Sequence, residues 1–170
     1  MNILAIDPGT SQSAFVEWQE GKIKDSGIVP NPQLLAMLRY PIEIYTQELC
    51  IEAVASYGMP VGKEVFETCF WIGRFMQQWI VYHAKEPRLV YRRDVKLHHC
   101  ASAKAKDSNI RQALIDKYGQ PWTWKVIDPN KPATGKNRVK VEGVTFGLHD
   151  DLWAAFSLAT YASETSGGAA

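Results

Sequence analysis

Residues 2–10, NILAIDPGT, place a continuous aliphatic run directly before an Asp-Pro-Gly turn. A short apolar run that ends in a turn predicts a strand buried on both faces, as in the centre of a sheet. Two more extended segments follow at 12–18 and 22–29, and Gly21 between them favours a tight turn. The beginning of the chain therefore predicts three antiparallel strands, with Asp7 at the end of the first.

The rest of the chain alternates between helical and extended patterns. The longest helical pattern repeats apolar residues at three- and four-residue steps, and the strand patterns are short apolar runs. This alternation predicts an α/β fold in which a mixed central β-sheet, beginning with three antiparallel strands, is flanked by α-helices. The further predicted elements are a short helix capped by Asn31, a strand at 48–54, a helix at 63–85, a strand at 88–91, a helix capped by Asp107 or Ser108 that continues through Tyr118, and a helix at 150–165.

The length of 170 residues suits one domain better than two. Hydrophobic residues make up 46% and charged residues 22%, which argues against a disordered or fibrous chain. We therefore predict a single domain over 1–165 and a flexible tail over 166–170. Residues 120–146 mix prolines, glycines and two tryptophans with five basic residues, and predict an irregular hairpin or ordered insertion that could extend a DNA surface.

Cysteine content and hydropathy bear on the cellular compartment. The three cysteines are odd in number and form no CxxC pair, which favours a reducing environment. The first residues lack the basic and apolar regions of a signal peptide, and no run of about 18 apolar residues predicts a membrane span. We expect a cytoplasmic protein, in a bacterial or phage-infected cell, without a membrane partner.

The net charge of +1 hides an uneven distribution of charge. Residues 1–87 hold 6 Lys and Arg against 10 Asp and Glu, whereas residues 88–170 hold 13 against 8. Seven basic residues and two acids lie between residues 88 and 111. Such a strip is typical of a surface that neutralises DNA phosphates, although a solvated helix face can have the same composition. The predicted DNA contacts in this strip include Arg92, Arg93 and Arg111.

Four carboxylates stand at the ends of predicted elements or inside an apolar run: Asp7, Glu52, Asp150 and Asp151. Asp7 could simply begin a turn, and Asp150 or Asp151 could simply cap a helix. Glu52 has no comparable local explanation, because a charged residue in an apolar strand is costly without a cation nearby. If the first and fourth strands are neighbours and the last helix crosses them, the four acids meet at one end of the sheet.

Converging carboxylates need a cation at neutral pH, because like charges cannot all ionise side by side. Oxygen ligands select Mg²⁺, and Mn²⁺ can substitute for it. Two such ions in one active site suit phosphodiester hydrolysis without a covalent intermediate. In this arrangement Asp7 bridges both ions, Glu52 binds one, and Asp150 with Asp151 binds the other.

Two other motifs have weaker functional readings. His98, His99 and Cys100 resemble zinc ligands, but adjacent residues rarely reach one tetrahedral ion, so DNA contact or packing suits them better. The segment ATGKN at 133–137 lacks the upstream glycine and the Ser or Thr of a phosphate loop. No nucleotide cofactor is therefore predicted.

A set of four segments carries a resemblance to a known family. They are LAIDPGT at 4–10, IEAV at 51–54, RRDVKLHHCASAKAKDSNIRQAL at 92–114 and HDDLWAAFSLATYA at 149–162. In this order they resemble the motifs of the RuvC-type Holliday junction resolvases, members of the RNase H-like superfamily. The order is more specific than any single motif, and the resemblance covers about residues 1–118 and 149–163. Divergence from the bacterial pattern favours a phage-type member.

The resemblance implies an RNase H-like fold and a homodimer whose two active sites make paired nicks in a four-way DNA junction. It implies that Lys96, with Lys104 or Lys106, contacts the DNA backbone, and that Tyr57 lies near the junction centre. The closing motif departs from the family, because no acid or histidine precedes Asp150 or Asp151 by three residues. The metal ligands among Asp150, Asp151 and the further candidate His149 therefore stay open.

These observations favour a structure-selective, Mg²⁺-dependent endonuclease that resolves Holliday junctions during DNA recombination and repair. One alternative is another nuclease of the same fold that cuts flaps, forks or RNA–DNA hybrids. A second alternative is a junction-binding protein without catalytic activity, and a weaker third is a small ATPase-related module. Cleavage of a four-way junction with Mg²⁺ and with EDTA separates the first possibility from the last two.

Overall fold

The computed structural model describes residues 2–39, 48–132 and 134–166, and its centre is a five-stranded sheet in the order β3-β2-β1-β4-β5. β1, β2 and β3 are antiparallel to one another, and β4 and β5 continue the sheet in parallel with β1. The predicted mixed α/β sheet with three initial antiparallel strands is thus confirmed. The sheet strands are β1 (Asn2–Asp7), β2 (Gln12–Gln19), β3 (Lys22–Pro30), β4 (Glu48–Ala53) and β5 (Arg88–Tyr91).

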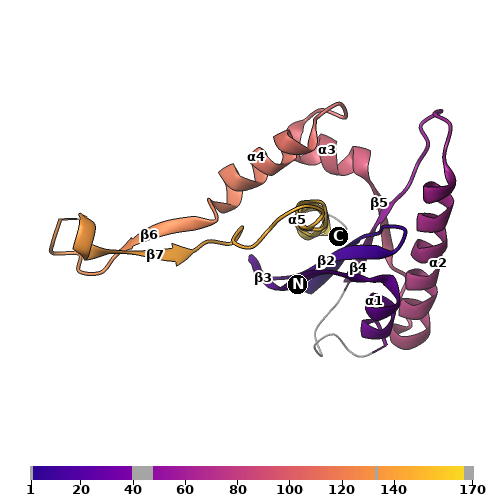
Figure 1. The fold of residues 1–170 in the computed structure, drawn as a ribbon, viewed down its shortest axis with the longest axis horizontal. Coiled ribbons are helices and arrows are strands. Elements are labelled where there is room, and N and C mark those ends of the chain that lie inside the picture. The colour runs from indigo at the N-terminus through magenta and orange to yellow at the C-terminus, as the bar shows by residue number, and fades with distance from the viewer. Residues whose placement is uncertain (1, 40–47, 133, 167–170) are drawn as a thin grey trace.

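Helices cover both faces of this sheet (Figure 1). One face packs against α5 (Leu152–Thr165), over which lie α3 (Arg92–Cys100) and α4 (Asp107–Tyr118). The other face packs against α1 (Asn31–Met37) and α2 (Lys63–His83). β1 supplies both cores, because alternate side chains of a strand point to opposite faces. Ile3 and Ala5 enter the α5 core, whereas Leu4 and Ile6 enter the α2 core.

The element boundaries follow the sequence pattern closely except at three places. α3 was not foreseen, because its nine residues carry Val95 as their single fully buried apolar side chain. α5 begins at Leu152 rather than at residue 150, because Asp150 takes a left-handed backbone conformation with φ of 42°. The third difference concerns the start of α1.

Asn31 was expected to cap α1, but Pro30 occupies the cap position and Asn31 has a different function. The Asn31 side chain is fully buried; its amide donates to the Gly9 carbonyl at 3.0 Å and accepts from the Ser13 hydroxyl at 2.6 Å. A Cβ at Gly9 would collide with the carbonyl oxygen of Gln12, so the turn after β1 needs glycine there. Asn31 therefore fixes the turn that follows Asp7.

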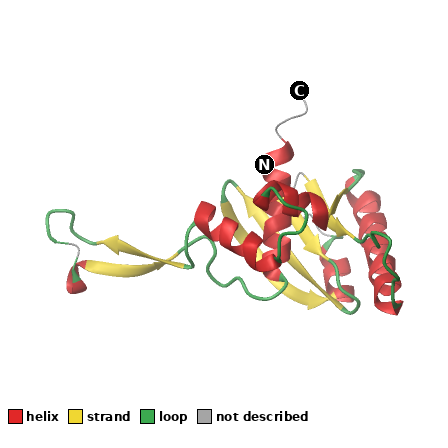
Figure 2. Cartoon of the chain, turned by 90° about the horizontal axis from the view of Figure 1, so that it is seen from above, coloured by secondary structure: helices red, strands yellow, loops and turns green. Residues whose placement is uncertain are grey.

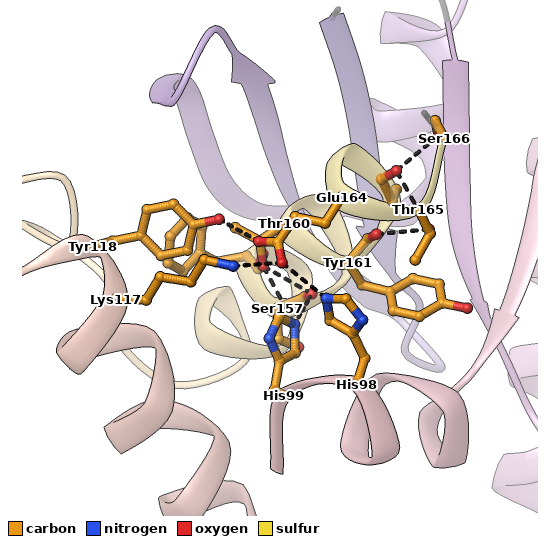
Figure 3. Close-up of polar contacts among 12 residues, drawn as sticks. His98, His99, Lys117, Tyr118, Ser157, Thr160, Tyr161, Glu164, Thr165 and Ser166 are labelled. Carbon is orange, nitrogen blue, oxygen red and sulfur yellow. Dashed lines mark hydrogen bonds and ion pairs between the residues drawn. The ribbon is translucent and has the colours of Figure 1, made fainter. Parts of the chain in front are cut away.

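α3 and α4 are fastened to the C-terminal end of α5 through one carboxylate (Figure 3). Glu164 on α5 accepts hydrogen bonds from Lys117 and Tyr118 on α4 and pairs with His98 on α3 at 2.9 Å. Burial opposes its ionisation, but these three partners outweigh burial and bring the pKa of Glu164 to about 2. His99 packs beside them, with its Nε2 at 2.9 Å from the Ser157 carbonyl oxygen.

Residues 120–146 contain a two-stranded antiparallel hairpin of β6 (Trp122–Val126) and β7 (Arg138–Glu142), with a 3₁₀ turn at Gly135–Asn137. This hairpin projects away from the body in two perpendicular views (Figures 1 and 2). Of the predicted tail, residues 167–170 lie outside the described part of the chain. Ser166 donates a hydrogen bond to Glu48 at 2.9 Å and is held at the end of α5.

No helix in the described residues is both long enough and apolar enough to cross a lipid bilayer.

Candidate active site

Asp7 and Glu52 stand side by side at the carboxyl ends of two neighbouring parallel strands. Ile6 of β1 pairs with Ile51 of β4, so the next residues of the two strands, Asp7 and Glu52, are aligned. Ile6 and Ile51 both enter the α2 core, so the pleat turns Asp7 and Glu52 to the opposite face, beneath α5. The predicted neighbourhood of the first and fourth strands thus exists, and both acids line one cleft of about 340 Å³.

The environment of Asp7 disfavours its charged form. Burial is the main cause, and the negative charges of Glu52, Asp151 and Asp107 add to it, whereas Arg92 acts in the opposite direction. Together they raise the pKa of Asp7 to about 8. A carboxyl group whose charged form is this unfavourable is suited to bind a cation or to keep a proton.

Glu52 has a cationic partner inside the protein. Burial raises the pKa of Glu52, and the guanidinium of Arg92, 3.3 Å from its Oε2, opposes that rise without cancelling it. Arg92 also donates to the Ser157 hydroxyl oxygen at 3.3 Å on α5. Only 22% of the Arg92 side chain and 16% of the Glu52 side chain are exposed, so solvent screens this pair less than a surface pair.

Asp107 joins the site although the sequence suggested only a helix cap for it. The Arg92 guanidinium donates to its Oδ1 at 2.7 Å, and this hydrogen bond lowers the pKa of Asp107. Lys106 occupies the cap position of α4 instead. Arg92, predicted as a DNA contact, thus bridges two carboxylates in this structure. The spacing between residues 92 and 107 gave no signal of this contact, because α3 and the following loop bring them together.

The closing acids Asp150 and Asp151 lie at the start of α5 but have different surroundings. Asp151 precedes the first helical residue and acts electrostatically on Asp7. The Asp150 side chain is 81% exposed and pairs with His149 Nδ1 at 3.0 Å. Both acids line a smaller cleft of about 90 Å³ together with Asp107 and Arg92. Because Arg92 lines this cleft and the one that holds Asp7 and Glu52, its side chain forms a wall between them.

Among the described residues, no three His, Cys, Asp or Glu side chains are already gathered closely enough to hold one metal ion. What the fold brings together is a partly buried acid pair, Asp7 and Glu52, with Asp151 within electrostatic range. Asp150 stands farther towards solvent, beside His149. The negative charge at this end of the sheet is thus partly compensated by the protein's own Arg92.

The predicted DNA-contacting residues surround these clefts to different degrees. Tyr57 is 58% exposed, lines the larger cleft, and has a positive φ of 47° in the loop after β4. The charge of Lys96 favours the ionised forms of Glu52 and Asp107, although burial keeps the pKa of Glu52 raised. Arg111 lies over the Trp153 ring, 4.7 Å from its centroid, and lines the smaller cleft. Exposed positions are also taken by Arg93, Lys104 and Lys106.

Comparison with known proteins gives a match in structure and none in sequence. No model of a protein family matches the chain, and no curated protein matches it. The solved structure of RuvC from Thermus thermophilus superposes with a TM-score of 0.62 and 11% identity, over 98% of this chain and 95% of that one. RuvC from T. thermophilus in complex with a Holliday junction substrate gives a TM-score of 0.60 and 13% identity, over 96% and 93%. The chain therefore has a RuvC-like fold of the RNase H-like type.

Proposed function

We propose that this protein is a divalent-metal-dependent endonuclease that resolves four-way DNA junctions by paired nicks. The observation that carries the proposal is the aligned, partly buried pair of Asp7 and Glu52 beneath the start of α5. Burial and the neighbouring acids raise the pKa of Asp7 to about 8, and a bound cation would favour its charged form. The RuvC-like fold and the junction bound in one RuvC structure support the choice of substrate.

The residues present fit Mg²⁺ or Mn²⁺, because the donors at this edge are carboxylate oxygens. Asp7, Glu52, Asp150 and Asp151 are the proposed ligands, with His149 as a further candidate. Two bound ions would supply the charge that activates an attacking water and stabilises the leaving 3′ oxygen. Arg92 keeps Glu52 oriented and prevents the acids from repelling one another before ions bind.

Backbone phosphates have to approach this negative site, and a rim of cations makes that possible. Lys96, Lys104, Lys106, Arg93 and Arg111 are the proposed phosphate contacts. Their affinity should fall as salt rises, because binding releases counterions from DNA. Tyr57, exposed at the mouth of the larger cleft, is the proposed contact near the branch point.

Two nicks in one junction require two active sites, so the proposal includes a homodimer. α2 offers a surface for it, because Phe66 and Phe70 lie one helical turn apart and are 56% and 69% exposed. Exposed aromatic residues so arranged are typical of an interface that a second copy covers. Replacement of Phe70 by Glu should convert a dimer to a monomer in sedimentation velocity, and a wild-type monomer would contradict this part of the proposal.

The decisive experiment compares cleavage of a mobile four-way junction by wild-type protein and Asp7→Asn. We expect paired nicks with Mg²⁺, none with EDTA, and junction binding without cutting by Asp7→Asn. Equal activity on flaps, forks or RNA–DNA hybrids would favour another nuclease of this fold. Junction binding without any cleavage in Mg²⁺ or Mn²⁺ would refute an enzymatic function and leave an architectural one.

A further inference from the structure

The β6–β7 hairpin has almost no side chains packed against the body of the protein. Every residue of β6 is exposed, and four of the five residues of β7 are exposed. A two-stranded ribbon that packs on nothing is marginally stable in water. This ribbon also presents large apolar side chains to solvent, among them Trp124 at 60% and Ile127 at 63% exposure. Both features favour a ribbon that is covered by a partner when the protein functions.

One face of the ribbon is both cationic and aromatic. Trp122 and Trp124 alternate along β6 and share this face with alternate residues of β7. Lys140 is opposite Trp124, Arg138 is diagonal to Trp124, and Glu142 is opposite Trp122. The Lys140 ammonium lies 4.2 Å from the Trp122 ring centroid, and the Arg138 guanidinium carbon lies 4.7 Å from that of Trp124. Each indole ring therefore makes a cation–π contact that orders the side chain of its cation.

The hairpin is ordered at both ends by specific contacts. At its base, the Thr145 hydroxyl donates to the Gly119 carbonyl at 2.8 Å, and Trp122 packs edge-on against Phe146. At its tip, the Asn137 amide donates to the Asp128 and Lys131 carbonyls at 2.9 and 3.0 Å. These contacts fix the conformation of the hairpin at its base and at its tip, so its cations have defined positions.

We propose that the β6–β7 hairpin binds a duplex arm of the DNA substrate, outside the cutting site, through Arg138, Lys140 and the other cations of the ribbon. The inference rests on the proposed function for the identity of the DNA as a branched substrate. The arm extends the footprint of one protomer beyond the carboxylates, because the hairpin points away from the body (Figure 1).

Charge selects the class of partner. From Trp122 to Glu142 the ribbon has five cations and two acids, and one of these acids, Asp128, is paired with Lys131 at 3.1 Å. A surface of this sign attracts a polyanion and repels a second hairpin of the same chain. The remaining cations of the ribbon are Lys125 and Lys136.

The shape of the ribbon favours duplex over single-stranded DNA. The major groove of B-DNA admits a two-stranded β-ribbon, and a ribbon exposed on both faces can enter it with phosphates on each side. Bases of a single strand need free aromatic ring faces for stacking. Here the indole rings of Trp122 and Trp124 each carry a cation of the same hairpin on one face.

The test measures junction binding in EDTA, so it does not depend on cleavage. The variant Arg138→Gln/Lys140→Gln removes two cations of the ribbon, and its matched control Arg39→Gln/Lys85→Gln removes an exposed Arg and Lys at the end of α1 and after α2. We expect the hairpin variant to bind a long-armed junction about tenfold more weakly. The slope of log K against log salt should fall by about two, since each phosphate contact contributes about 0.9. The control should match wild type in both.

Arm length separates an arm contact from a general charge effect. On a junction whose arms are too short to reach the ribbon, the hairpin variant and wild type should bind equally. A second variant, Lys125→Gln/Lys136→Gln, leaves both Trp–cation pairs intact, so a loss of affinity there cannot come from an unfolded ribbon. Unchanged affinity and slope in both hairpin variants would overturn the inference, as would an equal loss on long arms and on single strands.

Failure of the proposed function gives a different result. If the protein never cuts DNA, the same EDTA titrations on duplex and junction still report whether the hairpin binds an arm. If the protein cuts junctions and the hairpin variants bind like wild type on long arms, the inference alone is wrong.

Discussion

The two ends of α5 carry acids in opposite electrostatic situations. At its C-terminal end, Glu164 has three hydrogen-bonding partners, and its pKa falls to about 2 (Figure 3). At its N-terminal end, burial raises the pKa of Asp7 to about 8, and the charges of Glu52 and Asp151 add to that rise. Both ends use side chains from the same neighbouring segment, α3 and α4.

The difference distinguishes an acid whose charge is compensated by its partners from acids whose charge is compensated only in part. Glu164 is satisfied by Lys117, Tyr118 and His98, so it has little left to offer a ligand. Asp7 and Glu52 share Arg92 as an internal cation, and the pKa of both stays raised. Carboxyl groups in a cleft whose pKa stays raised in this way mark a candidate functional site. The four predictions below test this contrast, from the largest expected effect to the smallest.

The largest expected effect is the difference in cleavage rate between two variants, each of which neutralises an acid at one end of α5. Glu52→Gln should lower junction cleavage about 1000-fold or more, because charge stabilisation by metal ions is worth several kcal/mol and each 1.4 kcal/mol is tenfold in rate. Glu164→Gln should leave the rate nearly unchanged at a temperature where both variants are folded. Single-turnover cleavage at saturating protein measures both. Comparable rates for the two variants would remove the distinction.

Arg92 should show an intermediate effect, because it pairs with Glu52 and Asp107 and so positions the Glu52 carboxylate. We expect Arg92→Gln to lower cleavage about 10- to 100-fold, as for residues that orient metal ligands. Arg92→Lys should recover part of the loss, since an ammonium can reach one carboxylate but not both. Lys117→Gln, which removes a cation from Glu164, is the matched control and should cut like wild type. If Arg92 only stabilised the fold, Arg92→Lys would not cut faster than Arg92→Gln once the rates are compared at equal folded fraction.

The sequence predicted the fold because hydrophobic periodicity is a local signal. β1 reads as a buried strand from NILAI alone, and the three- and four-residue steps of α2 are visible without a partner. α3 escaped because it is short and polar, so its sequence resembles a loop. Its two histidines pack against α5, and that contact exists only once the chain has folded.

The candidate site was predictable only in part, for the same reason. Asp7 and Glu52 could be paired, since each ends a strand pattern and parallel neighbours align such ends. The contact of Arg92 with Asp107 could not, because it depends on how the loop after α3 turns. Asn31 looked like a helix cap, yet it is fully buried against Gly9 and Ser13. A short polar residue before a helix fits both uses, and tertiary packing decides between them.

Asp7 should make the protein less stable as pH rises, when metal is absent. Its folded pKa of about 8 lies above the ordinary value of 3.8, so the folded state retains a proton that the unfolded state loses in this range. Stability therefore falls between about pH 4 and 8 and levels off above. Asp7→Asn should unfold at a higher temperature than wild type, with a gap of at least about 2–4 °C above pH 8 that closes near pH 4. Thermal unfolding in EDTA measures the gap, and Mg²⁺ should narrow it.

Glu164 should show the opposite dependence and the smallest effect. Its folded pKa of about 2 lies below the ordinary value of 4.5, so its contribution to stability is present above pH 4.5 and is lost as pH falls towards 2. Glu164→Gln should lower the unfolding temperature at pH 7 by about 2–4 °C, the equivalent of about 1 kcal/mol for a chain of this size. Glu86→Gln, at an exposed position after α2, should change little. A deficit for Glu164→Gln that persists undiminished at pH 2.5 would mean that packing, rather than the charge on Glu164, fastens α3 and α4 to α5.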